Sequence, residues 1–218
     1  MNQPQVIINC AMSADGKIAL PSRRQLRISC EEDMQRVYKL RHTCDAVLVG
    51  IGTVLADDPK LTVKERYVPD PRQPLRIVLD SKGRTPKEAL VVNDKAQTMI
   101  VTATPCATSF GPHVEVLQGK VDKKGYIDLQ SLLLMLHTRG IRTLLVEGGS
   151  TVIWNFLREQ LVDDVFIYLG PLVVGGAHTP TMAGGEGIES EDKVIHLKLV
   201  DIERLGPGVL LHYKLDTP

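Results

Sequence analysis

The sequence predicts an α/β fold in which a mostly parallel central sheet is flanked by helices and extended by a C-terminal antiparallel hairpin. Short apolar, β-branched runs alternate with segments of helical periodicity along most of the chain, a pattern typical of a parallel sheet covered on both faces. Near the end of the chain the pattern changes to two β-rich runs joined by a Gly-Pro-Gly turn. The strands expected before the hairpin are Val6–Met12, Ala46–Gly50, Leu75–Asp80, Thr98–Thr102, Val114–Leu117, Thr143–Glu147 and Val165–Leu169.

Start and stop signals place three of the helices. Ser29 and Glu32 have the spacing of a capping box, in which hydroxyl and carboxylate satisfy each other's backbone amides, so a helix is expected from there to about Thr43. Two more helices are expected over Leu129–Thr138 and Thr151–Leu161, the first because Gly140 follows it and the second because it has an apolar stripe at helical spacing.

The hairpin is predicted from Val194–Arg204 and Val209–Leu215, and the Gly-, Pro- and acid-rich stretch Gly175–Asp192 before it is expected to be a loop. No repeat or low-complexity linker interrupts the chain. We therefore expect a single domain over residues 1–218.

Composition excludes several classes of protein. The 218 residues include 26 Lys+Arg and 26 Asp+Glu, so the formal net charge is zero and no broad field would attract nucleic acid or a membrane surface. The apolar runs are far shorter than the roughly 20 residues of a membrane-spanning helix. The four cysteines are widely spaced, the histidines lack metal-ligand spacing, and the N-terminus lacks a signal-peptide pattern, so we expect a cytoplasmic protein without a metal site.

A Gly-x-Gly segment, Gly50-Ile51-Gly52-Thr53, directly follows the second expected strand. Such a turn allows close approach of the backbone to a ligand, and Thr53 would present its hydroxyl and amide to phosphate or ribose. The segment does not complete the dinucleotide fingerprint, so a tight strand-to-helix turn closed by Asp57-Asp58-Pro59 is an equal alternative.

A second candidate is the stretch Glu147-Gly148-Gly149-Ser150-Thr151, in which a strand ends in a carboxylate and two glycines open a helix. Backbone amides at a helix N-terminus bind anions, and ligands of open α/β sheets bind beyond the carboxyl ends of strands. A capped loop with a solvated Glu147 is the alternative.

A third strand end carries Asp80, Ser81, Lys82 and Arg84. An acid at such a position favours the ribose 2′-hydroxyl of NAD, whereas the two cations favour the 2′-phosphate of NADP. A charged surface turn is at least as compatible with this segment.

Taken together, several motifs in one order resemble the riboflavin-biosynthesis pyrimidine reductases. The resemblance implies a dihydrofolate-reductase-like fold, a homodimer, and hydride transfer from NADPH, or NADH in some relatives, to C1′ of the ribosylamino group of a phosphorylated pyrimidinone. The motifs are Ser13-Ala14-Asp15-Gly16-Lys17, Arg27–Asp33, Val49–Pro59 with Leu61-Thr62-Val63, Arg76–Ser81, Glu147-Gly148-Gly149 and Leu161-Val162-Asp163.

Matching this sequence to the family's motifs implies a role for each of several residues. Glu147 is implied as a substrate contact and is our candidate proton donor. Lys64 stands where the bacterial pattern has a phosphate-binding Arg, so Lys64, Arg66 or the Arg23–Arg27 segment is expected to complete the phosphate site. The implied cofactor contacts are Ala19, Thr53, Asp57, Ser81, Gly149, Ser150, Thr151 and Val152, and the implied substrate contacts are Arg41, Leu61, Lys64 and Glu147.

One activity is not expected, and two alternative functions remain open. The deaminase fused to many bacterial relatives requires Pro-Cys-x-x-Cys and His-x-Glu, and Pro105-Cys106-Ala107-Thr108 lacks the second cysteine, so no deaminase activity is expected. A reductase of the same fold acting on another pterin- or folate-like ring is an alternative. A non-catalytic NADPH-binding sensor is another, although such a sensor would not need the substrate-side residues Arg41 and Glu147.

Overall fold

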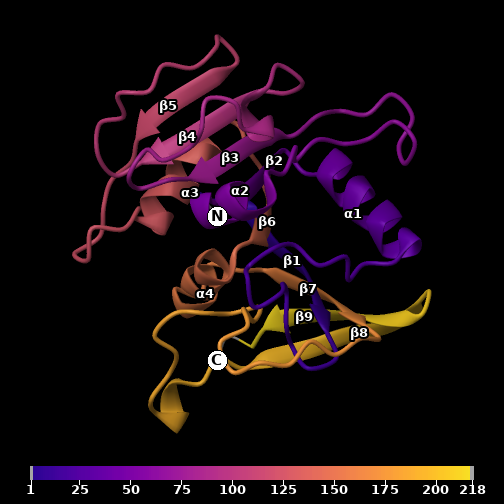
Figure 1. Ribbon diagram of the computed structural model, residues 1–218. Coiled ribbons are helices and arrows are strands. Elements are labelled where there is room, and N and C mark those ends of the chain that lie inside the picture. Colours follow the sequence, from indigo (N-terminus) through magenta and orange to yellow (C-terminus); the bar gives the residue numbers. More distant parts are fainter. Residues whose placement is uncertain (1, 217–218) are drawn as a thin grey trace. The chain divides into compact units, whose positions relative to one another are not determined.

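The computed structural model describes residues 2–216, which divide into two compact units. The first unit comprises residues 2–5 and 38–145, and the second comprises residues 6–37 and 146–216. Helix α1 (Glu31–Thr43) and strand β6 (Thr143–Gly148) each pass from one unit into the other. Figure 1 labels these elements along the chain.

The first unit contains four parallel strands in the spatial order β5 (Val114–Gln118), β4 (Thr98–Thr102), β3 (Leu75–Leu79) and β2 (Ala46–Gly50). Every residue of β2 and β4 is buried, as the continuous apolar runs of a two-face-covered parallel sheet require. Two helices, α2 (Ile51–Asp57) and α3 (Leu129–Thr138), belong to this unit (Figure 1).

Helix α3 has the bounds that its sequence predicts. Its start is fixed by Asp128, whose carboxylate accepts a hydrogen bond from the Ser131 N–H (2.6 Å), and Gly140 follows its end in a left-handed conformation (φ +88°). The helix buries Leu129, Leu132, Leu133 and Leu136, which recur at helical spacing.

The second unit contains β1 (Gln5–Ser13) from Val6 onward. This strand lies parallel to β7 (Asp164–Gly170), which is followed in the sheet by the antiparallel strands β9 (Gly208–Leu215) and β8 (Leu197–Leu205). Helix α4 (Ser150–Arg158) precedes β7. The mostly parallel sheet and the C-terminal antiparallel hairpin expected from the sequence are thus confirmed, and Figure 1 shows the hairpin in yellow.

Many element boundaries differ from the predicted ones, most of them by one residue, and three of the differences concern α1, α4 and β8. Helix α1 begins at Glu31, and the Sγ of Cys30, rather than the Ser29 hydroxyl, accepts the Asp33 N–H (3.5 Å). Helix α4 ends at Arg158 rather than Leu161, because Gln160 adopts a left-handed conformation (φ +55°). Strand β8 begins at Leu197 rather than Val194.

Helix α2 places the Gly-x-Gly segment at a helix start. The helix begins at Ile51, directly after the last residue of β2, so Gly50 is its N-cap and Gly52 and Thr53 lie in its first turn. Ligand binding by this segment and the strand-to-helix turn closed by Asp57-Asp58-Pro59 are both compatible with this geometry. Among the described residues, no helix has the length and apolar character needed to cross a membrane.

Candidate functional site

The twelve site residues expected from the sequence divide evenly between the two units. The first unit carries Arg41, Thr53, Asp57, Leu61, Lys64 and Ser81, and the second carries Ala19, Glu147, Gly149, Ser150, Thr151 and Val152.

Arg41 and Lys64 converge on one aromatic ring in the first unit. The guanidinium carbon of Arg41 lies 5.3 Å from the centroid of the Tyr38 ring, and the Lys64 Nζ lies 5.4 Å from the same centroid. Arg41 also donates from Nη1 to the carbonyl oxygen of Thr62 (3.3 Å), next to Leu61. Three of the expected substrate contacts, Arg41, Leu61 and Lys64, therefore belong to one local cluster.

A second tyrosine extends this cluster. The Tyr67 ring stacks on Tyr38 with 4.5 Å between centroids and 13° between planes, and the Arg66 guanidinium lies 4.4 Å above Tyr67. Arg41, Lys64 and Arg66 thus bring three cationic groups to one aromatic pair, which suits a phosphorylated ligand. Of the three candidates for completing the phosphate site, Lys64 is the one that shares a ring with Arg41.

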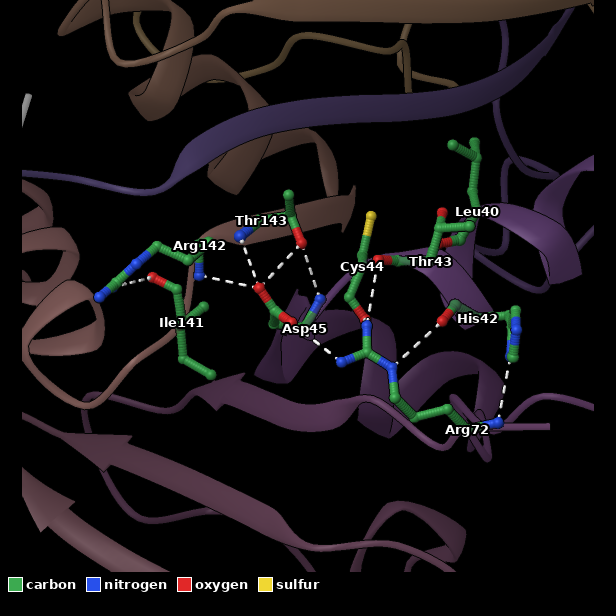
Figure 2. A network of polar contacts seen from close by, with 9 residues as sticks. All are labelled: Leu40, His42, Thr43, Cys44, Asp45, Arg72, Ile141, Arg142 and Thr143. Carbon is green, nitrogen blue, oxygen red and sulfur yellow. Dashed lines mark hydrogen bonds and ion pairs between the residues drawn. The ribbon is translucent and has the colours of Figure 1, made fainter.

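The last turn of α1, which carries Arg41, is capped by Arg72 (Figure 2). Arg72 donates from Nη2 to the carbonyl oxygens of Thr43 and Cys44 (both 3.0 Å) and from Nε to that of His42 (3.4 Å). These are the carbonyl groups that a helix leaves without intrahelical partners at its C-terminus. Sequence reasoning missed Arg72, because its partners lie about 30 positions away in the chain.

The carboxylate of Asp45 completes this arrangement. It pairs with Arg72 Nη1 (3.0 Å) and accepts from the backbone N–H groups of Arg142 (2.8 Å) and Thr143 (3.0 Å), which point toward it in Figure 2. Burial by itself raises the pKa of the Asp45 carboxyl, but these hydrogen bonds outweigh it and hold the pKa below its ordinary value. The carboxylate therefore stays ionised at neutral pH and keeps Arg72 in place.

The segment after Leu61 is held by Gln73. Its amide oxygen accepts from the Val63 N–H (2.8 Å) and its amide nitrogen donates to the Val63 carbonyl (3.0 Å), so one side chain pairs with both backbone groups. Leu61 itself is buried and has a left-handed backbone conformation (φ +52°), which is uncommon for a residue with a Cβ. Arg41 and Gln73 together fix the two residues that follow it, Thr62 and Val63.

Thr53 and Asp57 lie on α2, and both side chains are half-buried. The helix ends at Asp58, which has a left-handed conformation (φ +42°) and whose N–H donates to the Val54 carbonyl (3.0 Å). The Asp58 Oδ1 in turn accepts from the Leu90 N–H (2.7 Å). The structure therefore presents Thr53 and Asp57 from a helix whose end is tied to the segment around Leu90.

The turn after β3 settles the role of Asp80. Its side chain is fully buried, and its Oδ2 accepts from both the N–H and the hydroxyl of Thr85 (2.7 Å each). Asp80 is thus a structural residue and not the ribose ligand that its position in the sequence allowed. Lys82 and Arg84 are exposed, and the half-buried Ser81 accepts at its carbonyl from the Ala103 N–H (3.1 Å).

Gly83 allows close packing within this turn. It has a left-handed conformation (φ +64°), and a Cβ placed on it would lie 3.0 Å from the Sγ of Cys106. Cys106 is therefore in contact with the turn that carries Ser81.

In the second unit, Glu147 and the two following glycines lead into α4. The Gly148–Gly149 peptide is cis, Gly148 has φ +120°, and Gly149 is the N-cap of the helix. The Gly149 carbonyl accepts from the N–H groups of Val152 and Ile153 (3.0 and 3.1 Å). The expected residues Gly149 to Val152 thus form the N-terminus of a nine-residue helix, with the half-buried Glu147 on the strand before it.

A glycine-rich loop lies on this first helical turn. The Gly184 N–H donates to the Ser150 carbonyl (3.2 Å), and a Cβ on Gly184 would lie 2.9 Å from the Ser150 hydroxyl. A Cβ on Gly185 would approach Trp154 to 2.6 Å. Only glycine therefore allows the loop to pack this closely on α4, a constraint that the sequence pattern alone did not reveal.

The motif around Asp15 has a structural explanation. The Asp15 carboxylate accepts from the Ser13 hydroxyl (2.6 Å) and from the N–H groups of Val174 (3.1 Å) and Gly175 (2.7 Å). These hydrogen bonds lower its pKa to about 2. They tie the loop that carries Ala19, itself bridged to Gln25, to the segment after β7. The Ser-x-Asp-Gly pattern, typical of a side-chain-stabilised turn, is the signal that indicates this role.

The described residues include no group of three or more His, Cys, Asp or Glu arranged to hold a metal ion.

Comparison with known proteins identifies the family. The model of the RibD C-terminal domain matches residues 4–211. The chain belongs to this family. It is 42% identical to the 2,5-diamino-6-ribosylamino-4(3H)-pyrimidinone 5′-phosphate reductase of Archaeoglobus fulgidus over 94% of this chain and 95% of that protein. The Methanothermobacter thermautotrophicus protein of the same name is 40% identical over 97% of this chain and 98% of its own length.

Solved structures of RibD-type proteins agree with this membership. A Thermotoga maritima deaminase/reductase superposes with a TM-score of 0.84 at 29% identity, covering 98% of this chain. The chain spans 57% of the length of that bifunctional protein. A dihydrofolate reductase from Enterococcus faecalis superposes over 99% of this chain and 98% of its own with a TM-score of 0.53 at 12% identity, a likeness of fold alone. The expected dihydrofolate-reductase-like fold is confirmed.

Proposed function

We propose that this RibD C-terminal domain protein is a reductase of riboflavin biosynthesis that acts on 2,5-diamino-6-ribosylamino-4(3H)-pyrimidinone 5′-phosphate. The proposal is supported by the names of the archaeal relatives at 40–42% identity and nearly full coverage. The structural observation that carries it is the pair of cations, Arg41 and Lys64, on the Tyr38 ring. Two cations next to one ring suit the 5′-phosphate that distinguishes this substrate from a pterin or folate-like ring.

The reaction requires hydride delivery to C1′ of the ring-opened sugar imine and a proton at the adjacent nitrogen, giving the ribitylamino product. NADPH supplies the hydride when it is bound, and the protein must orient the two reactants and hold the proton. We assign proton delivery to Glu147, at the end of a strand next to the glycine turn. Arg41, Leu61, Lys64 and Glu147 are the proposed substrate contacts.

The proposed cofactor contacts are Ala19, Thr53, Asp57, Ser81 and the helix start formed by Gly149, Ser150, Thr151 and Val152. A helix N-terminus suits the pyrophosphate, because its backbone N–H groups point outward. We propose NADPH rather than NADH because Asp80 is buried against Thr85, whereas the Lys82 and Arg84 side chains are exposed near Ser81, where they suit a 2′-phosphate. Arg84 also pairs with the buried carboxylate, with 3.9 Å between its Nε and the Asp80 Oδ1.

We also propose that residues 1–218 act as one domain, that the protein is cytoplasmic, and that it forms a homodimer through the edge strand β8. This strand exposes Leu199, Val200 and Ile202 (46%, 49% and 58% exposed), and an unpaired edge with apolar side chains favours association. The four free cysteines fit a reducing compartment.

Steady-state oxidation of NADPH and of NADH, measured separately with the ribosylamino-pyrimidinone phosphate, with its deaminated analogue and with dihydrofolate, tests the function. We expect turnover with the first pyrimidine and NADPH, and none with dihydrofolate. Turnover of dihydrofolate alone would favour the folate-like alternative. NADPH binding without oxidation in the presence of any of the three compounds would favour the sensor.

A further inference from the structure

Arg76, in strand β3, is a fully buried arginine that the proposed reaction does not use. In the described part of the chain, its guanidinium donates to five neutral oxygens and to no carboxylate. Burial lowers its pKa to about 10, partly opposed by the charge of Asp94. Since an unpaired buried charge is costly, a side chain of this kind needs a reason that packing alone does not give.

The five acceptors lie in two segments. Three strong bonds go to Asn93 Oδ1 (2.9 Å), the Asn93 carbonyl (2.5 Å) and the Ala96 carbonyl (2.6 Å), and a weaker one goes to the Leu90 carbonyl (3.4 Å). The fifth goes to the carbonyl of Lys60 (3.4 Å), directly before Leu61. Arg76 therefore joins the segment around Leu90–Asn93 to the segment that enters the substrate cluster.

Asp58 makes a second connection between the same segments. Its Oδ1 accepts from the Leu90 N–H (2.7 Å), so both backbone groups of Leu90 are held, one by Asp58 and the other by Arg76. Two residues shortly before Leu61 are therefore held by hydrogen bonds: Asp58 through the Leu90 N–H and Lys60 through Arg76. This explains how Leu61 is kept in its left-handed conformation and how Thr62 is presented to Arg41.

We propose that Arg76 is a positioning residue for the substrate site, acting through the Lys60 carbonyl and the Leu90–Asp58 bond to set the backbone of residues 58–62. The link between Arg76 and substrate binding rests on the proposed function. The role of Arg76 in setting the backbone of residues 58–62 rests on the hydrogen bonds alone. Small displacements of a binding segment have large kinetic effects, so a substitution that frees this segment should weaken pyrimidine binding more than cofactor binding.

The test compares five variants of the full-length protein. Arg76→Met removes all the donors, and Arg76→Lys keeps the charge but not the fork that reaches both segments. Asp58→Gly removes the acceptor of the Leu90 N–H at an exposed position, and glycine adopts the left-handed conformation of this residue without strain. Asp58→Asn keeps an oxygen that can accept from the same N–H. Ile77→Val, in the next, fully buried position of β3, is the control for a loss of core packing.

Two readouts are measured: amide hydrogen exchange over residues 58–63, and the KM values for the pyrimidine and for NADPH. We expect faster exchange in Arg76→Met, Arg76→Lys and Asp58→Gly. In the two Arg76 variants we also expect an increase of about tenfold in the pyrimidine KM and of less than about threefold in the NADPH KM. Asp58→Asn and Ile77→Val should behave as wild type in both readouts. If Arg76→Met does not fold, Arg76→Lys, which keeps the charge, still tests the role of Arg76, and Asp58→Gly tests the Leu90–Asp58 bond separately.

Unchanged exchange over residues 58–63 in Asp58→Gly and the Arg76 variants would overturn the proposal, as would equal changes in Ile77→Val. Altered exchange with an unchanged pyrimidine KM would overturn the link to the substrate. If the wild-type protein reduces no pyrimidine, the proposed function fails, while the exchange data still decide whether Arg76 sets this segment.

Discussion

The guanidinium of Arg72 lies 3.0 Å from the carboxylate of Asp45 and at the same time donates to the carbonyls of Thr43 and Cys44. An ion pair is therefore combined with a helix C-cap in a single side chain. Because Arg41 is in the turn that is capped, this pair helps to determine where the proposed phosphate-binding cation lies.

Replacement of Arg72 by Ala should lower the free energy of unfolding by about 1–3 kcal/mol, since it removes the donor to three backbone carbonyls and the cationic partner of the partly buried Asp45 carboxylate. Arg139→Ala, which breaks the exposed pair with Glu115, is the matched control and should cost less than about 1 kcal/mol. Urea unfolding followed by circular dichroism measures both. Equal losses would show that the capping bonds of Arg72 contribute nothing beyond an exposed ion pair.

Replacement of Lys64 by Met should raise the pyrimidine KM about tenfold and leave the NADPH KM unchanged, because the ammonium is one of two cations on Tyr38. Arg66→Met should have a smaller effect, since Arg66 lies over Tyr67 instead. The control is Lys39→Met, an exposed position on the same helix as Arg41. A larger effect for Arg66→Met than for Lys64→Met would assign the phosphate to Arg66.

Replacement of both Lys82 and Arg84 by Ser should lower the preference for NADPH over NADH about tenfold, through a higher NADPH KM. NADH has a neutral hydroxyl in place of the 2′-phosphate and gives these cations no anion to bind, so the NADH KM should not change. Lys87→Ser, also exposed, serves as the control. Parallel changes with both cofactors would remove these side chains from 2′-phosphate recognition.

Replacement of Glu147 by Gln should lower kcat while leaving the affinity for NADPH within about twofold of wild type, because the amide keeps the shape but cannot deliver the proton. Glu159→Gln, which changes a carboxylate beyond the end of α4, should retain wild-type kcat. Turnover unaffected by Glu147→Gln would exclude this carboxylate as the proton donor.

Asp15 gives a prediction for acid stability. Its pKa in the folded protein, about 2, is below the ordinary value of 3.8, so the stabilising effect of its hydrogen bonds is complete above about pH 4 and is lost as the pH falls toward 2. Asp15→Asn should therefore be less stable than wild type at neutral pH, and the two free energies of unfolding should converge on acidification. Curves that stay parallel down to pH 2 would contradict the assigned hydrogen bonds.

The elements best predicted from the sequence are those with signals inside the element itself. Helix α3 has its predicted bounds because Asp128 and Gly140 are local start and stop residues, and the fully buried strands β2 and β4 also have their predicted bounds. The end of α4 was misplaced because Gln160 adopts a left-handed conformation without being glycine.

The candidate site was predictable as a list of positions and not as an arrangement. The family resemblance supplied Arg41 and Lys64, but their shared ring, Tyr38, depends on stacking with Tyr67, 29 positions away. Asp80 shows the converse, since its sequence context fits a ribose ligand and only its burial against Thr85 excludes that role. Partners this distant in the chain leave no periodicity or spacing that a single sequence could reveal.

The packing of Cys106 against Gly83 provides a natural attachment point for a reporter dye. Burial raises the pKa of the Cys10 thiol to about 12, so it stays protonated and unreactive toward alkylating reagents near neutral pH, and Cys44 is also buried. Cys30 is half-buried, and its thiol makes hydrogen bonds with the Leu205 carbonyl and the Asp33 N–H. Selective labelling at Cys106 would therefore place a fluorophore beside the Ser81 turn without any engineered cysteine, and its emission would report on binding of the dinucleotide that we propose for this turn.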